Sequence, residues 1–240
     1  MSKDRMLLAV LIDADNIPAK HAKAILREIT TLGELALRRV YGDWSSSALS
    51  NWKKEVVELG LVANQETANT KGKNASDIGL VIDAMDILHT GRFDGFVLVS
   101  SDSDFTALAN RLREDGVEVY GVGEAKAPAS LRNVCNKFIM IENLVDQEEE
   151  NGKSDLPPVS AGPISQPGKL IKLTKAAMRS IDPDGEWYSL SAIGSHLVRA
   201  NPDFDSRTYG RAKLSDLMKM LTPFETRKKD GTHMEVREKG

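Results

Sequence analysis

Four aspartates stand at positions where carboxylates could do chemistry. Asp13 ends the apolar run LLAVLI, Asp102 and Asp104 follow the run FVLV, and Asp77 stands at the start of a helical pattern. Carboxylates that share a site repel one another, so a group of several usually holds a divalent cation. The four residues therefore predict a metal-dependent site for phosphate chemistry.

Mg²⁺ or Mn²⁺ is the expected cofactor. Both ions accept an oxygen shell in which one or two carboxylates bind directly and waters complete the coordination. The ion would polarise a phosphodiester oxygen and lower the pKa of a bound water, and a remaining carboxylate would orient or deprotonate that water. We expect Asp13, Asp77, Asp102 and Asp104 to be both catalytic residues and metal ligands.

Each aspartate also has an ordinary structural explanation. Asp77 and Asp104 would suit helix N-caps or first-turn charges, and Asp13 and Asp102 would suit loop carboxylates satisfied by backbone N–H groups. Four such residues at one predicted sheet edge favour the metal site. Asp83 lies about 240° from Asp77 around a helix, so we expect it outside that site.

Substrate-binding candidates flank these acids. Asn16 could hold a substrate oxygen or a ligand carboxylate, with an Asx turn as the alternative. Ser100 offers a hydroxyl group. Lys71 and Lys73, in the stretch TANTKGKN, are predicted to bind nucleic-acid phosphates, with a solvated loop as the alternative.

The elements that must position these residues alternate between strand and helix over residues 1–145. This alternation predicts an α/β fold with a mostly parallel sheet that is flanked by helices. The carboxyl ends of its strands would bring the aspartates to one edge. The predicted strands cover residues 7–12, 35–41, 61–64, 95–99 and 118–122, and the predicted helices cover about 18–31, 48–59, 77–88 and 105–114.

The rest of the chain predicts a linker and a second domain. Residues 146–166 are acidic and then rich in Pro, Gly and Ser, which is typical of a flexible linker. Residues 167–240 carry three helical patterns, the third starting at Ser206 or Thr208, and then two short strands around the hairpin dipeptide Asp230-Gly231. This is the outline of a small winged helix-turn-helix domain.

Composition restricts the classes of protein. Hydrophobic residues make up 41% of the chain and charged residues 28%, as in soluble globular proteins. No apolar run approaches the roughly 20 residues of a membrane helix. Cys135 is the single cysteine, which excludes an internal disulfide and fits a cytoplasmic location.

The acidic motifs resemble a known family. The blocks LIDADNIP, KGKNASDIGLVIDAMD and VLVSSDSDFTALANRLREDGVEVYGVG are similar to the signature blocks of NYN domains, in the PIN-like ribonuclease superfamily. The resemblance implies a PIN-like α/β fold and, for many members, metal-dependent cleavage of RNA. It matches Asp13, Asn16, Asp77, Asp102 and Asp104 to the family's acids and asparagine, with no expected acid missing.

The C-terminal region resembles OST-HTH/LOTUS domains through the blocks PDFDSRTYG, KLSDLMKML and PFE. The resemblance implies a winged-helix fold and RNA binding, in some members with a protein partner. From residue 169 onward the chain holds 14 Lys and Arg against 10 Asp and Glu, a modest indication of nucleic-acid contact. The candidate phosphate contacts are Arg207, Arg211, Lys213, Lys219, Arg227, Lys228 and Lys229.

Three functions follow from these patterns. The favoured one is a divalent-metal endoribonuclease with a tethered RNA-binding winged helix. The first alternative is an RNA-binding or regulatory adaptor that does not cleave. The second alternative is a phosphatase of the haloacid dehalogenase type, with Asp13 as the nucleophile and Asp15 as the general acid.

Overall fold

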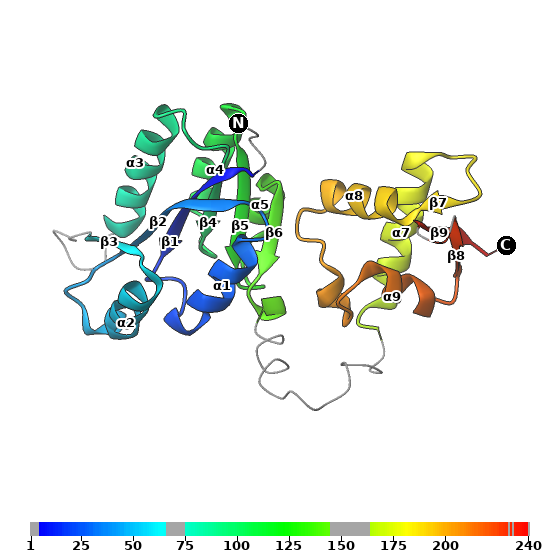
Figure 1. Ribbon diagram of the computed structural model, residues 1–240, viewed down its shortest axis with the longest axis horizontal. Helices are drawn as coiled ribbons and strands as arrows, with labels where there is room; N and C mark the ends of the chain where they lie inside the picture. Colours follow the sequence, from blue (N-terminus) through cyan, green and yellow to red (C-terminus); the bar gives the residue numbers. More distant parts are fainter. Residues whose placement is uncertain (1–4, 66–74, 145–163, 230, 232, 240) are drawn as a thin grey trace. The chain divides into compact units, whose positions relative to one another are not determined.

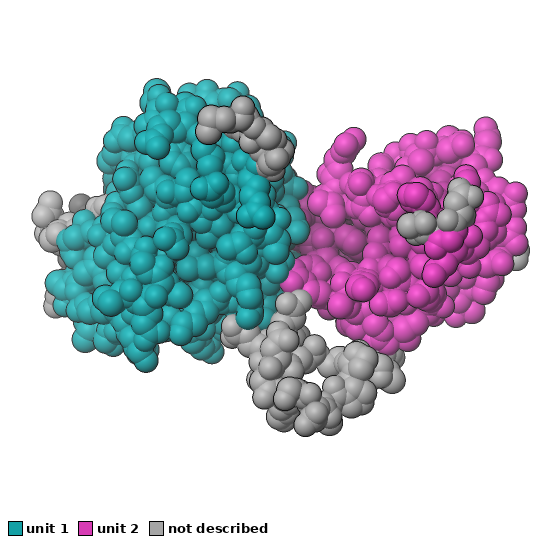
Figure 2. Space-filling model, in the orientation of Figure 1, with its two compact units in different colours: residues 1–153 teal, residues 154–240 magenta. Residues whose placement is uncertain are grey.

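The chain divides into two compact units, Met1–Lys153 and Ser154–Gly240 (Figure 2). The computed structural model describes residues 5–65, 75–144, 164–229, 231 and 233–239. Most of the predicted linker, 146–166, lies outside these described residues. None of the helices in the described ranges has the length and apolar character that crossing a membrane requires.

A parallel sheet organises the first unit (Figure 1). Within the described residues its strand order is β3-β2-β1-β4-β5-β6, and every neighbouring pair is parallel. The predicted α/β class with a mostly parallel sheet is confirmed. The strands are β1 (Leu7–Asp13), β2 (Glu34–Gly42), β3 (Val62–Gln65), β4 (Gly95–Val99), β5 (Glu118–Gly123) and β6 (Lys137–Met140).

Helices flank this sheet and explain why its central strands are almost wholly apolar. A strand covered on both faces reads as a continuous hydrophobic run, as β1 and β4 do. The helices are α1 (Ala22–Ile29), α2 (Ser50–Leu59), α3 (Ala75–His89), α4 (Phe105–Glu114) and α5 (Ala129–Val134). Short 3₁₀ turns, η1 (Ala19–His21) and η2 (Ser47–Leu49), precede α1 and α2.

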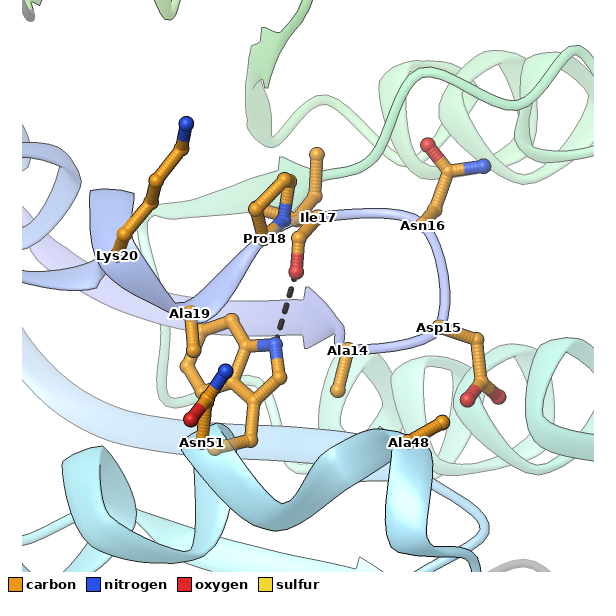
Figure 3. Close-up of a pocket in the computed structure, with 10 residues that line it drawn as sticks. Ala14, Asp15, Asn16, Ile17, Pro18, Ala19, Lys20, Ala48 and Asn51 are labelled. Atoms are coloured by element: carbon orange, nitrogen blue, oxygen red, sulfur yellow. Dashed lines mark hydrogen bonds between the residues drawn. The ribbon is translucent and has the colours of Figure 1, made fainter.

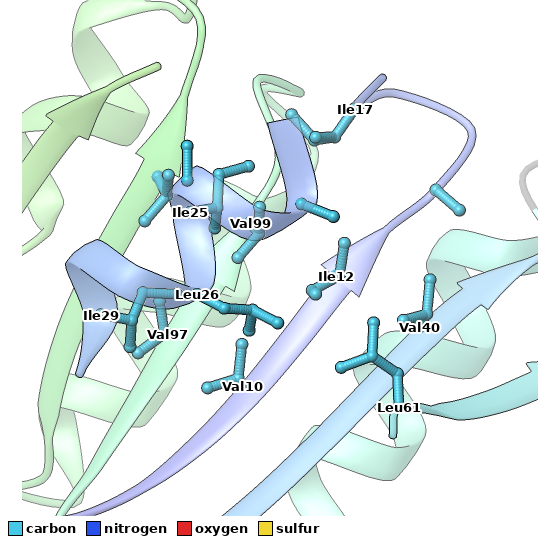
Figure 4. Packing of buried hydrophobic residues seen from close by; sticks show 14 of the residues in the cluster. Val10, Ile12, Ile17, Ile25, Leu26, Ile29, Val40, Leu61, Val97 and Val99 are labelled. Carbon is cyan, nitrogen blue, oxygen red and sulfur yellow. The ribbon is translucent and has the colours of Figure 1, made fainter. Parts of the chain in front are cut away.

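The two faces of β1 belong to two separate hydrophobic clusters. Val10 and Ile12 pack in the cluster that holds Ile25 and Ile29 of α1 (Figure 4). The alternate residues of β1 pack in the cluster that holds buried residues of α3 and α4. Because side chains alternate along a strand, β1 is clamped from both sides, and its carboxyl end is fixed in place.

Two elements of this unit, α5 and β6, were not predicted from the sequence. The six residues of α5 are too few to display a helical repeat of apolar residues. The four residues of β6 pair only with β5, at the edge of the sheet. Neither element supplies one of the predicted site residues.

The second unit combines three α-helices with a small antiparallel sheet, in the part of the chain that the structure describes. Its sheet order is β7-β9-β8, and its core includes Leu170, Ile193, Leu217 and Val236. Pro167 begins the first helix, where its missing N–H costs no hydrogen bond. The elements are α7 (Pro167–Ile181), β7 (Tyr188–Ser189), α8 (Leu190–Ala200), α9 (Leu214–Met220), β8 (Phe224–Lys229) and β9 (His233–Glu238).

The prediction of one continuous third helix starting at Ser206 or Thr208 is wrong. The 3₁₀ turn η3 (Ser206–Tyr209) ends at Gly210, whose φ of 84° is the left-handed conformation that favours glycine. The helix α9 begins only at Leu214. The apolar spacing over 214–221 marked the helix correctly, and the glycine marked its break.

Candidate active site

Asp13 is the buried acid of the site, with only 3% of its surface exposed. It ends β1, and its two carboxylate oxygens have different donors. The Ser100 hydroxyl donates to Oδ2 at 2.8 Å, and the Asn16 backbone N–H donates to Oδ1 at 3.2 Å. The side chain is therefore held in one orientation at the carboxyl end of the sheet.

Burial raises the pKa of Asp13 to about 6, from an ordinary value of 3.8. The Ser100 hydrogen bond opposes this rise in pKa, and the negative charges of Asp77 and Asp15 add to it. A carboxylate kept in such surroundings is under-compensated. A nearby cation would restore its ordinary ionisation.

Asp102 and Asp104 lie in the tight turn between β4 and α4. The backbone N–H of Asp102 donates to Ser100 Oγ at 3.1 Å, and the backbone N–H of Asp104 donates to Asp102 Oδ1 at 2.9 Å. Asp104 occupies the N-cap position of α4, but its side chain makes no capping hydrogen bond. The helix-cap explanation for Asp104 therefore does not account for its carboxylate.

Asp77 lies in the first turn of α3, and the charges of the other acids affect its pKa. Burial raises its pKa, and the charges of Asp102, Asp104 and Asp15 raise it further. None of the described groups that shift this pKa is a cation. The structure thus brings the carboxylates of β1, α3 and the β4–α4 turn into one negatively charged cluster.

The loop after β1 is fastened to the turn after β4. Asn16 Oδ1 accepts a hydrogen bond from the Ser101 backbone N–H at 3.2 Å. Ser101 Oγ in turn accepts from the Glu124 backbone N–H at 2.8 Å, just after β5. The ends of β1, β4 and β5 therefore form one connected rim beside the acids.

The family comparison identifies this arrangement. A model of the NYN domain matches residues 7–142, more than half of the chain. The chain belongs to the NYN-domain family. A model of the OST-HTH/LOTUS domain matches residues 165–236. NYN domains are part of the PIN-like ribonuclease superfamily, and OST-HTH/LOTUS domains are associated with RNA binding. The chain therefore joins a domain of a nuclease superfamily to a domain of a type that is associated with RNA binding.

One solved structure shares its fold with more than half of this chain. A protein of unknown function from Vibrio parahaemolyticus is 18% identical, with a TM-score of 0.50 over 59% of this chain and 96% of that chain. An uncharacterized protein from Nitrosomonas europaea is 33% identical, covering 36% of this chain and 88% of that chain, with a TM-score of 0.28. A search of curated proteins gave no significant match.

The carboxylate oxygens of the NYN domain are of the ligand type that a divalent cation such as Mg²⁺ prefers. Within the described residues, no three His, Cys, Asp or Glu side chains are gathered into a ready-made ligand shell. Mg²⁺ needs only one or two direct carboxylates and keeps several waters, so a shell of three protein acids is not required. The mutual repulsion at Asp77 indicates that these oxygens would bind a cation favourably.

Asp15 is an additional acid of this site that the motif analysis did not assign to it. Its side chain is exposed, and its charge raises the pKa of both Asp13 and Asp77. From the sequence, a role for Asp15 is expected only in the phosphatase alternative. Its position two residues after the strand-ending Asp13 is the signal that would have included it.

Asp83 has a structural role, separate from the acid cluster. Its carboxylate is hydrogen-bonded to Arg39, to the Tyr41 hydroxyl and, at 3.3 Å, to Asn64 Nδ2. Burial and the bond to Asp83 raise the pKa of Tyr41. These contacts fasten α3 to β2 and β3.

The candidate phosphate contacts differ in whether their side chains already form ion pairs or hydrogen bonds within the protein. Lys71 and Lys73 lie outside the described residues. Arg207 forms an ion pair with Asp205 at 2.6 Å, with 16% of its side chain exposed. Arg211 donates to the Gly210 carbonyl, and Lys219 lies 3.5 Å from Asp216.

The charges on the β8–β9 hairpin are also largely paired. Arg227 and Lys229 both contact Glu235, at 2.7 and 3.2 Å, and the Arg227 bond lowers the pKa of that acid most. Arg227 also stacks on Trp187, 3.9 Å from the ring centroid. Lys213, before α9, and Lys228, on β8, have exposed side chains.

Proposed function

We propose that this protein is a divalent-metal-dependent endoribonuclease that hydrolyses RNA phosphodiesters, and that its OST-HTH/LOTUS domain binds the RNA. The observation that carries the proposal is the raised pKa of Asp77, caused after burial by the charges of Asp102, Asp104 and Asp15. Acids that repel one another at the sheet edge of a PIN-like domain favour the binding of a Mg²⁺ or Mn²⁺ ion.

Asp13, Asp77, Asp102 and Asp104 would hold the ion. When bound, it supplies positive charge to a phosphodiester oxygen and lowers the pKa of a coordinated water. Asp104 is the exposed member of the set, at the mouth of the site, so we assign it the role of accepting the proton of the attacking water.

Two polar side chains would orient this machinery. Ser100 contacts both Asp13 and the Asp102 backbone, so its hydroxyl fixes the separation between those acids. The side-chain oxygen of Asn16 accepts a hydrogen bond from the Ser101 backbone N–H. This bond leaves the side-chain nitrogen of Asn16 to donate to other partners. We assign that nitrogen to an oxygen of the RNA backbone.

The C-terminal domain would capture the substrate. We propose a winged-helix domain over 167–240, joined to the nuclease domain of 1–145 by a flexible linker of 146–166. A tether raises the local concentration of captured RNA at the nuclease site. Lys213 and Lys228 are the preferred phosphate contacts, because Arg207, Arg227 and Lys229 are already paired with acids. A cytoplasmic location completes the proposal.

Cleavage of a mixed RNA pool tests the proposal. We expect the purified protein to cut RNA with Mn²⁺ or Mg²⁺, to stop when EDTA is added, and to lose activity at least about a hundredfold in Asp102→Asn. Asp86→Asn is the matched control, because Asp86 is an exposed acid of α3 that contributes to none of the raised pKa values in the cluster.

Equal cutting by Asp102→Asn and the wild type would contradict this site. Tight RNA binding without metal-dependent cutting by the wild type would instead establish the non-catalytic adaptor. The assay therefore separates the two functions that the domain composition allows.

A further inference from the structure

A pocket of about 320 Å³ opens beside the acid cluster (Figure 3). One wall is the loop after β1, which supplies Ala14, Asp15 and Asn16. The opposite wall is the start of α2 with its preceding turn, which supplies Ala48 and Asn51. The loop that carries the first catalytic acid of the proposed site is thus also a wall of this pocket.

The pocket is held open by fixed contacts. Trp52 forms its floor with only 2% of its surface exposed, and its indole Nε1–H donates to the Ile17 carbonyl at 2.8 Å. The Ile17 backbone N–H donates to the Asp13 carbonyl oxygen at 3.0 Å, which ties the loop back to β1. The floor and the loop wall are therefore joined to the acid site by direct hydrogen bonds.

A glycine allows the second wall of the pocket to pack close to the loop after β1. A Cβ added at Gly42 would lie 2.6 Å from Leu49 Cδ1 and 3.4 Å from Ala14 Cβ. Because glycine leaves this space empty, the η2 turn packs against the end of β2 and places Ala48 beside the loop. The absence of a side chain at Gly42 therefore allows the turn that carries Ala48 to pack close to the loop that carries Ala14.

The chemistry of the walls suits a heterocyclic base. Asp15 supplies an acceptor, Asn51 supplies a donor and an acceptor, and the methyl group of Ala48 supplies an apolar surface between them (Figure 3). Lys20 adds a cation at the rim. A phosphate alone would be repelled by Asp15, and a purely apolar ligand would offer Asn51 no hydrogen-bonding partner.

We propose that this pocket is a nucleobase subsite that holds the base of a nucleotide next to the scissile phosphate. The inference rests on the proposed nuclease function and assigns it a source of sequence preference. A carboxylate accepts hydrogen bonds from the exocyclic amines of adenine, cytosine and guanine, whereas the two carbonyl oxygens that flank the N3–H group of uracil would repel it. Asp15 therefore favours an amine-bearing base over uracil at this position. Lys20, which also lines the pocket, would contact the phosphate of that nucleotide.

Short single-stranded RNAs that differ at one nucleotide near the cut measure this preference. We expect the wild type to cut those with an amine-bearing base about tenfold faster than the uridine version. Asn51→Ala, which removes the amide, and Ala48→Leu, which fills the pocket, should each reduce that ratio towards one. Val57→Ala is the control on the same helix, because Val57 is 82% exposed and does not line the pocket.

The outcomes separate the subsite from the nuclease. An unchanged base preference in both Asn51→Ala and Ala48→Leu, with normal cutting, would overturn the subsite and leave the nuclease intact. If the wild type cuts no RNA with either metal, the proposed function fails, and the same RNAs are then compared by equilibrium binding in EDTA. In that case equal affinities of the wild type for the amine-bearing and uridine RNAs would overturn the subsite, and a preference lost only in the pocket variants would support it.

Discussion

Asp13 shows how a functional acid can weaken the protein that carries it. Its pKa of about 6 means that the folded state favours the protonated form. The stabilisation is fully present below the ordinary pKa of 3.8 and is lost as the pH rises through 6. At neutral pH the metal-free protein therefore holds a buried charge that disfavours folding.

Asp13→Asn should raise the free energy of unfolding at pH 8 in EDTA by about 1–3 kcal/mol, since the gap between 3.8 and about 6 corresponds to at most about 3 kcal/mol. Urea unfolding at pH 4.5 and pH 8 measures the effect, which at pH 4.5 should fall to about a third of its value at pH 8. Asp86→Asn serves as the exposed control. A variant no more stable than the wild type at pH 8 would show that the charge of Asp13 is compensated in the folded protein.

At the same scale, the chemistry-bearing residues were easier to predict than their partners. The strand ends placed Asp13 and Asp102 at one edge before any coordinates were known, because parallel strands end on the same side. The pairing of Arg207 with Asp205 and of Arg227 with Glu235 depends on side-chain geometry that no local pattern encodes. For this reason the cations were all expected to face RNA.

At the scale of elements, α3 depends on its contact with the sheet. The Asp83 carboxylate joins this helix to β2 and β3, through Arg39, Tyr41 and Asn64. The same helix carries Asp77 in its first turn. The orientation of a proposed metal ligand is therefore set about two turns further along the helix.

Asp83→Ala should destabilise the protein by about 1–3 kcal/mol, because it leaves the partly buried Arg39 and Tyr41 groups without their acceptor. It should also weaken Mn²⁺ binding, measured by calorimetry, through the displaced Asp77. Asp86→Ala, on the exposed face of the same helix, should change neither quantity. Full Mn²⁺ affinity in a folded Asp83→Ala protein would show that the Asp83 contacts do not set the orientation of Asp77.

The end of β5 lies close to the turn between β4 and α4, which carries Asp102 and Asp104 of the proposed site. A Cβ added at Gly123 would lie 2.6 Å from the Ser100 carbonyl oxygen and 3.0 Å from Ser101 Oγ. Gly123→Ala should displace this turn, lower the cleavage rate and cost about 1–3 kcal/mol of stability. Gly168→Ala is the control, because a Cβ there meets nothing within 4 Å. Normal cleavage by Gly123→Ala would mean that the turn tolerates displacement.

Helices and strands with long apolar patterns were predicted from the sequence, and two short elements of the NYN domain were not. The helix α4 (Phe105–Glu114) was located at both ends, because its apolar spacing is regular and Gly116 follows it with a φ of 83°. In contrast, α5 and β6 escaped prediction, because six and four residues carry too little periodicity. Tertiary contacts, rather than local preference, define these short elements.

At the scale of the whole molecule, two domains with different tasks share one chain. The NYN match covers residues 7–142 and the OST-HTH/LOTUS match covers 165–236. Under the proposed function, cleavage of a short RNA would need only the first domain, whereas capture of a long RNA would use both. The benefit of the second domain should therefore depend on covalent connection and on substrate length.

Severing the predicted linker after folding tests this dependence. A specific protease site inserted within 146–166, once cleaved, should raise the KM for long RNA about tenfold or more and leave the rate on very short RNA unchanged. The uncleaved insertion protein is the control. Equal KM values before and after severing would show that the domains act independently on RNA.

The hydrogen bonds around Ser100 all run in one direction. The Asp104 backbone N–H donates to Asp102, the Asp102 backbone N–H donates to Ser100, and the Ser100 hydroxyl donates to Asp13. The Ser100 hydroxyl accepts one of these bonds and donates another, so the bonds on its two sides strengthen each other. A ligand that shifts the Asp102 backbone would therefore also affect the Asp13 carboxylate at the end of β1, and the energetic effects of changing Ser100 and Asp13 singly would not add.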